Sequence, residues 1–153
     1  MYYVMVLLLM AVLPIISIAL EIILCNPTDI IVIIIKWFVF WSVGVRFITA
    51  SIKQILQPKY TSENILGINN QQSWILVREL GISNLSIGII GIFSLLNPQW
   101  IIPAGLSGGI FLGLAGINHI LQKHKNYLEK VATISNLFVS MVLFVFIVLL
   151  FLQ

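Results

Sequence analysis

The sequence predicts an all-α fold: an integral membrane helical bundle of about five transmembrane helices, forming a single domain over residues 1–153. Three observations lead to this prediction. Hydrophobic residues make up 60% of the chain, and the mean hydropathy is +1.11. Charged residues make up only 8%, whereas a soluble domain has about 25%. The apolar residues also form five runs, each long enough to cross a bilayer, which requires about 20 helical residues.

The five expected helices follow one another with short connections. The first, residues 2–24, has no basic start and no cleavage site of small residues, so we interpret it as a retained helix rather than a signal peptide. The second, residues 30–56, is longer than a span requires, which predicts tilt. The others are expected at residues 73–96, 100–121 and 131–152.

Basic residues in the connections predict the orientation, because Lys and Arg concentrate on the cytoplasmic side. The turns at residues 25–29 and 97–99 contain no basic residue. The two longer connections contain Lys59, Lys123, Lys125 and Lys130. We therefore expect a cytoplasmic N-terminus, both lysine-bearing connections on the inner side, and an outer C-terminus.

The longer of these two connections is expected to contain a short helical turn. Thr61 or Ser62 is a candidate N-cap, because a hydroxyl can accept a hydrogen bond from the free backbone N–H groups of a first turn. Gly67 is the expected stop, because glycine adopts the left-handed conformation that ends many helices.

Polar residues recur in the expected cytoplasmic halves of helices two to five. Ionisable side chains are costly at bilayer depth, so they usually face the bundle interior and mark candidate sites. The candidate ligand-binding or intramembrane polar residues are Arg46, Arg78, Glu79, Asn84, His119 and Asn136. On helix two, Ser42, Arg46, Thr49 and Lys53 recur at helical spacing and form one stripe.

We expect these residues to line a cytoplasm-facing pocket. Two arginines against one glutamate leave positive charge, which suits an anionic head group, a phosphate, a carboxylate or a quinone carbonyl. The alternative is a structural ion-pair network in which Glu79 pairs with Arg46 or Arg78. His119 is either a proton carrier, since histidine titrates near physiological pH, or a residue that caps the helix end.

Other groups suggest packing rather than chemistry. Gly105, Gly109 and Gly113, followed by Gly116, form a row that permits close helix contact, either within the chain or between two copies. On the outer side, Glu21 and Lys36 either pair across the first two helices or extend separately to the membrane interface.

Several classes of function are disfavoured. A single cysteine, Cys25, forms no internal disulfide or cysteine-based cluster. His119 and His124 are spaced unlike a zinc motif and have no carboxylate near them in the sequence, so no metal is expected. The sequence has no paired carboxylates and no nucleophile motif of the kind that would predict an enzyme. No cofactor or nucleic-acid partner is expected.

Three segments, residues 36–46, 77–85 and 113–119, resemble an uncharacterised family of small bacterial multi-pass inner-membrane proteins, classed as a domain of unknown function. The element Arg78-Glu79-Leu80-Gly81 with Asn84-Leu85 is the most specific part. The small helical architecture is more distantly similar to DoxX-type membrane proteins, with no residue match to carry over. The resemblance implies a bacterial inner-membrane location and no particular activity.

These observations favour a binding or accessory membrane protein whose inner-leaflet pocket holds an anionic or amphiphilic ligand such as a lipid or quinone. Membrane lipids are the expected partners, together with a second copy or a larger membrane complex. The alternative function is a small-solute or proton-coupled transporter.

Overall fold

The structure, a computed structural model, describes residues 2–26, 29–121 and 127–152. Within these ranges every regular element is a helix. Five helical segments are long and apolar enough to cross a membrane: Tyr3–Cys25, Ile30–Leu56, Gln71–Phe93, Pro98–Leu121 and Tyr127–Phe151. The prediction of an all-helical chain with five such segments is confirmed. Pro27, Thr28, Lys123, His124 and Lys125 lie outside the described residues.

The first two of these segments each contain a π-helical stretch. The first comprises α1 (Tyr2–Leu7), η1 (Leu8–Val12) and α2 (Leu13–Cys25), and the second α3 (Ile30–Phe38), η2 (Val39–Val45) and α4 (Arg46–Leu56). The two stretches touch, because Ser42 Oγ in η2 donates a hydrogen bond to the Leu9 carbonyl in η1 at 3.0 Å. A π-helical turn holds more residues than an α-helical turn, so η2 shifts the direction in which the following residue, Arg46, points.

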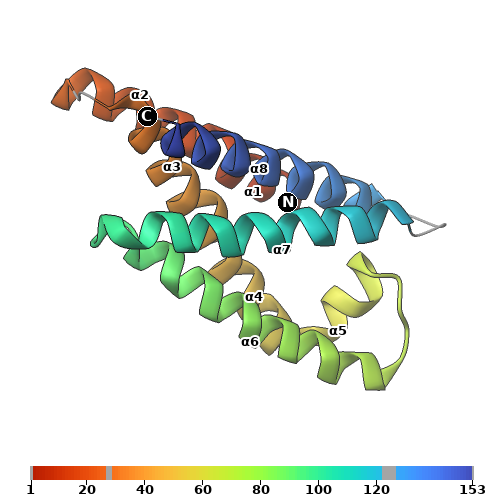
Figure 1. Ribbon diagram of the computed structural model, residues 1–153. Helices are drawn as coiled ribbons and strands as arrows, with labels where there is room; N and C mark the ends of the chain where they lie inside the picture. The colour runs from red at the N-terminus through yellow and green to blue at the C-terminus, as the bar shows by residue number, and fades with distance from the viewer. Residues whose placement is uncertain (1, 27–28, 122–126, 153) are drawn as a thin grey trace.

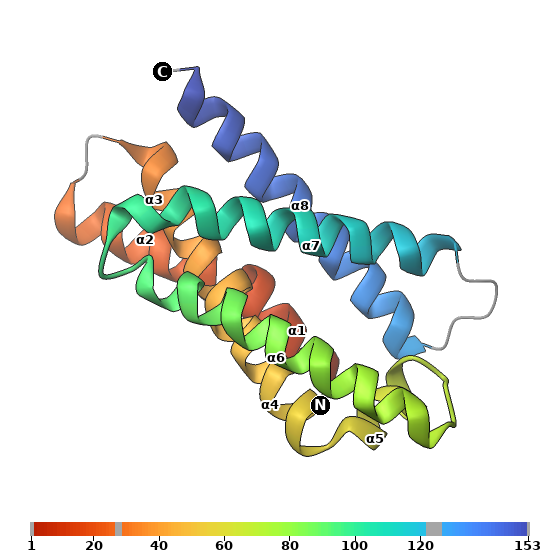
Figure 2. The same ribbon diagram turned by 60° about the horizontal axis from the view of Figure 1, so that its bottom comes forward.

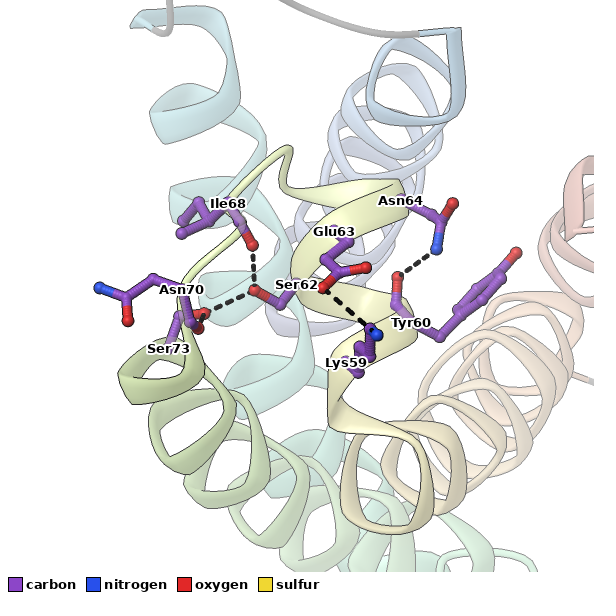
Figure 3. Close-up of polar contacts among 8 residues, drawn as sticks. All are labelled: Lys59, Tyr60, Ser62, Glu63, Asn64, Ile68, Asn70 and Ser73. Atoms are coloured by element: carbon purple, nitrogen blue, oxygen red, sulfur yellow. Dashed lines mark hydrogen bonds and ion pairs between the residues drawn. The ribbon is translucent and has the colours of Figure 1, made fainter.

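The connection after α4 is helical for most of its length. It consists of α5 (Pro58–Tyr60) and η3 (Thr61–Ile65). The expected N-cap is wrong, because the helix already begins at Pro58, whose fixed φ suits a first helical position. Ser62 instead closes the loop: its Oγ donates to the Ile68 carbonyl at 2.6 Å and lies 2.6 Å from Ser73 Oγ (Figure 3).

Gly67 ends this helical segment with a φ of 70°, as expected. A Cβ at this position would meet nothing within 4 Å. We therefore expect Gly67→Ala to destabilise the protein by about 1 kcal/mol through backbone strain alone. Gly67→Asn should cost less, because asparagine tolerates the left-handed region. Thermal unfolding of both variants in detergent measures the difference, and equal unfolding temperatures for Ala and Asn would contradict it.

The helices pack as two antiparallel pairs with the first segment against them. The remaining long helices are α6 (Gln71–Phe93), α7 (Ile101–Leu121) and α8 (Tyr127–Phe151), and the short η4 (Pro98–Trp100) leads into α7. Helix α6 runs along α4, and α7 runs against α8 (Figures 1 and 2). The chain ends lie at opposite ends of the bundle (Figure 2).

Glycines set the closest helix contacts. A Cβ on Gly91 of α6 would lie 2.6 Å from the backbone nitrogen of Gly44 in η2, so the two backbones touch there. The predicted row on α7 faces α8: a Cβ on Gly113 would lie 2.7 Å from Ser140 Oγ, and one on Gly116 would lie 2.7 Å from Leu137. Gly105 lies near Ile147 and Val39, and Gly109 near Leu143.

At the end of the bundle opposite the α5 connection, Glu21 joins the first two segments. Its carboxylate pairs with Lys36 and accepts a hydrogen bond from Trp37 Nε1 at 2.5 Å. Of the two sequence-based alternatives, pairing across the helices is therefore the one observed. Each charged side chain is 21% exposed, so solvent partly screens the attraction between them.

Candidate functional site: a polar cavity where the helices meet

A cavity of about 170 Å³ lies where all five long segments and η3 meet. Its apolar lining residues are Met5, Val6, Phe47, Ala50, Ile65, Leu66, Leu80, Phe111, Leu112, Ala115 and Ala132. Its polar lining residues are Arg46, Lys53, Gln54, Thr61, Asn84, His119 and Asn136. Ligand sites have this composition, a mostly apolar wall with a few polar groups that orient the ligand.

Arg46 is held at this cavity by α8. Its side chain is buried, and Nη2 donates hydrogen bonds to Ser135 Oγ at 2.8 Å and to Asn136 Oδ1 at 2.7 Å. Ser135 and Asn136 lie on the inward face of α8 because they follow the buried Ala132 at helical spacing. These two oxygens of α8 thus fix the direction of the guanidinium.

Asn84 reaches the cavity from α6. Asn84 is 4% exposed, and its Nδ2 donates a hydrogen bond to Gln54 Oε1 at 2.7 Å. Among the described residues, Asn84 Oδ1 has no hydrogen-bond partner. Gln54 lies on α4, one position after Lys53, so this amide pair joins α4 to α6 at the cavity wall.

A second cation, Lys53, lies on α4 two helical turns after Arg46, and both residues line the cavity. Lys53 Nζ is 4.9 Å from the centre of the Tyr60 ring, a distance at which a cation is attracted to the ring face. Thr61, Ile65 and Leu66 complete this side of the cavity, so the α5–η3 connection forms part of its wall.

His119 pairs with a carboxylate that the sequence analysis did not assign to it. His119 Nδ1 lies 3.2 Å from Glu129 Oε1, and Glu129 is only 2% exposed. Glu129 is ten residues from His119 in the sequence, before the expected start of the last helix at residue 131. Helix α8 begins at Tyr127 instead, so Glu129 lies in its first turn. Acidic residues favour the first turn of a helix, and this preference was the signal in the sequence.

The structure brings together four of the six predicted site residues: Arg46, Asn84, His119 and Asn136 all line the cavity. The other two do not line it. Arg78 and Glu79 are exposed on α6. Lys53, Gln54, Thr61 and the buried Glu129 take part in this region without having been named as site residues.

No group of three or more metal-ligating side chains occurs within the ranges that the structure describes. The polar groups of the cavity are instead two cations, three amides, a hydroxyl and an imidazole. This set can bind an anion and orient hydrogen-bonding groups beside it.

Comparison with known proteins decides the family. The model of a family of unknown function, DUF6790, matches residues 1–153. The chain belongs to this family. No curated protein and no solved structure matches it. Membership in DUF6790 assigns no activity, so the function must be argued from the cavity itself.

Proposed function

We propose that this DUF6790 protein is a multi-pass membrane protein, located in a bacterial inner membrane with its N-terminus in the cytoplasm. The surface supports insertion in lipid. In the first segment, Tyr3–Cys25, the most apolar window has a hydropathy of 2.8, yet only 17% of it is buried. Large apolar side chains are exposed on every segment, including Ile23, Ile52, Ile82, Leu114 and Met141. Exposed apolar area on this scale needs lipid or a partner to cover it.

Within that setting, the proposed function is to bind the anionic group of an amphiphilic ligand, as a binding or accessory subunit. The observation that carries this proposal is the pair of cations, Arg46 and Lys53, lining one largely apolar cavity. Guanidinium and ammonium groups both bind phosphate and carboxylate groups. An anionic group of this kind would lie beside the two cations, and the apolar walls suit the adjoining hydrocarbon.

Neutralising the cavity arginine tests this proposal. Native mass spectrometry of the detergent-purified protein would count bound phosphatidylglycerol, with neutral phosphatidylcholine as the comparison lipid. We expect Arg46→Gln to lower retention of phosphatidylglycerol about tenfold, since a hydrogen bond to a charged group contributes about 1.5–3 kcal/mol. Arg78→Gln removes the same charge from an exposed position, so it should stay within about twofold of wild type.

Folding must be checked separately, because Arg46 also holds Ser135 and Asn136. Lys53→Gln therefore serves as a second variant, since that side chain contacts the Tyr60 ring and, among the described residues, takes no part in the hydrogen bonds that join Arg46 to α8. Wild-type retention in both Arg46→Gln and Lys53→Gln would refute the proposal. Selective loss of the anionic lipid in both would support it.

A second candidate function is proton-coupled transport of a small solute. One observation favours it: His119 lines the cavity while its ring contacts the buried Glu129. Histidine titrates in the physiological range, and buried ionisable pairs of this kind form proton relays in transporters. Transport by this route would depend on Glu129 rather than on the exposed Glu79.

A further inference from the structure

We infer that the ligand of this cavity carries a hydrogen-bond donor, a hydroxyl or ammonium group, within a few bonds of its anionic group. The inference rests on the proposed function and narrows its ligand class. It favours a headgroup such as that of phosphatidylglycerol over an oxidised quinone.

The unpartnered amide oxygen of Asn84 carries the inference. Asn84 is only 4% exposed, and it lines the cavity. Its Nδ2 donates to Gln54 Oε1, and its Oδ1 has no partner in the part of the chain that the structure describes. Buried polar groups almost always have a hydrogen-bond partner, so an unpartnered one beside a cavity indicates a missing donor.

The remaining polar groups of the cavity define where each part of the ligand lies. Arg46 and Lys53 can only donate hydrogen bonds, so they select an anion. Asn136 Oδ1 already accepts from Arg46. Asn84 Oδ1 on α6 is therefore an acceptor of the cavity wall that is available to a donor on the ligand.

The cavity is large enough for a single small group that contains both the anion and the donor. An apolar cavity of about 150 Å³ admits a molecule the size of benzene, and this cavity measures about 170 Å³. A phosphate with a short hydroxylated arm is comparable in size. An oxidised quinone only accepts hydrogen bonds, so it would leave Asn84 Oδ1 unpaired. A quinol could donate to that oxygen but carries no anion for the cations.

An anionic group with a nearby hydrogen-bond donor occurs both in a membrane lipid headgroup and in a soluble glycerol phosphate. The mostly apolar wall favours the lipid. The experiment compares two pairs of probes that differ in the donor and share the charge: phosphatidylglycerol against phosphatidylmethanol in nanodiscs, and glycerol 1-phosphate against methyl phosphate in solution. Binding of the lipid pair is read by native mass spectrometry, and binding of the soluble pair by calorimetry.

We expect wild type to prefer the hydroxylated probe about tenfold, because leaving a buried acceptor unpaired costs about 1–3 kcal/mol. The preference should fall to about unity in Asn84→Leu, which keeps the size and removes the acceptor. Ser83→Ala, at the neighbouring exposed position of α6, should retain it. The comparison within wild type needs no variant, so it stands even where Asn84→Leu fails to fold.

The outcomes separate the two proposals. Equal binding of both probes in each pair by wild type would overturn this inference and leave the proposed anion site standing. A preference that persists in Asn84→Leu would also overturn it. Failure of wild type to bind any of the four probes would overturn the proposed function and the inference together.

Discussion

Gly91→Ala is expected to lower the unfolding temperature of the detergent-purified protein by about 5 °C, taking a cost of 1–3 kcal/mol for overpacking and the usual conversion for this chain length. The new Cβ would lie 2.6 Å from the nitrogen of Gly44 and 2.7 Å from its Cα. Both are backbone atoms in the middle of a helix, so they cannot rotate aside. Helix α6 would have to move away from η2, and the contacts beside Gly91 would be lost with it.

The matched control is Gly109→Ala on α7. There the new Cβ would lie 3.6 Å from side-chain atoms of Leu143 and Phe144, an ordinary contact. Alanine is also favoured over glycine in a helix by about 1 kcal/mol, so this variant should be as stable as wild type or slightly more stable. Circular dichroism during heating measures both. Unfolding of Gly91→Ala at the same temperature as Gly109→Ala would disprove the close approach of α6 to η2.

His119→Leu is expected to cost about 2 kcal/mol of stability, because it removes a hydrogen-bond partner from a buried charged group. Glu129 is 2% exposed, and its Oε1 lies 3.2 Å from His119 Nδ1. Asn118→Leu, at the neighbouring exposed position of α7, should change stability by less than about 0.5 kcal/mol. Urea or thermal unfolding in detergent provides the comparison.

A double variant measures the interaction energy between His119 and Glu129. The effects of His119→Leu and Glu129→Gln should not add, with a coupling of about 1 kcal/mol between them. Additive effects would mean that the two side chains do not interact. The same proteins in liposomes test the transport candidate: proton-driven uptake that is unchanged in Glu129→Gln would exclude a relay through this pair.

Much of the architecture could be predicted from the order of residues. The five apolar runs predicted five helices to within a few residues at most ends, since length and composition alone decide which segments can form such helices. The start of the last helix was missed by four residues, at Tyr127 rather than residue 131. That small difference moved Glu129 from a supposed connection into the first turn of α8.

The candidate site could be predicted only in part. Position along a helix follows from counting residues, which placed Arg46, Asn84, His119 and Asn136 at one level, and all four line the cavity. The direction of a side chain around the helix depends on which neighbours pack against it. Arg78 and Glu79 lie at a similar height along α6 to the cavity residues but on an exposed face, where residue counting could not assign them.

The sequence by itself therefore determined the helical class, the number of long apolar segments and the level at which polar groups occur, because these depend on local composition and helical rise. Only the tertiary structure decided which polar groups share a cavity. The π-helical stretch before Arg46, the glycine contact between α6 and η2, and the meeting of α7 with the first turn of α8 set those directions. These features depend on how the helices pack against one another, and the local composition that predicts the helices does not fix their directions.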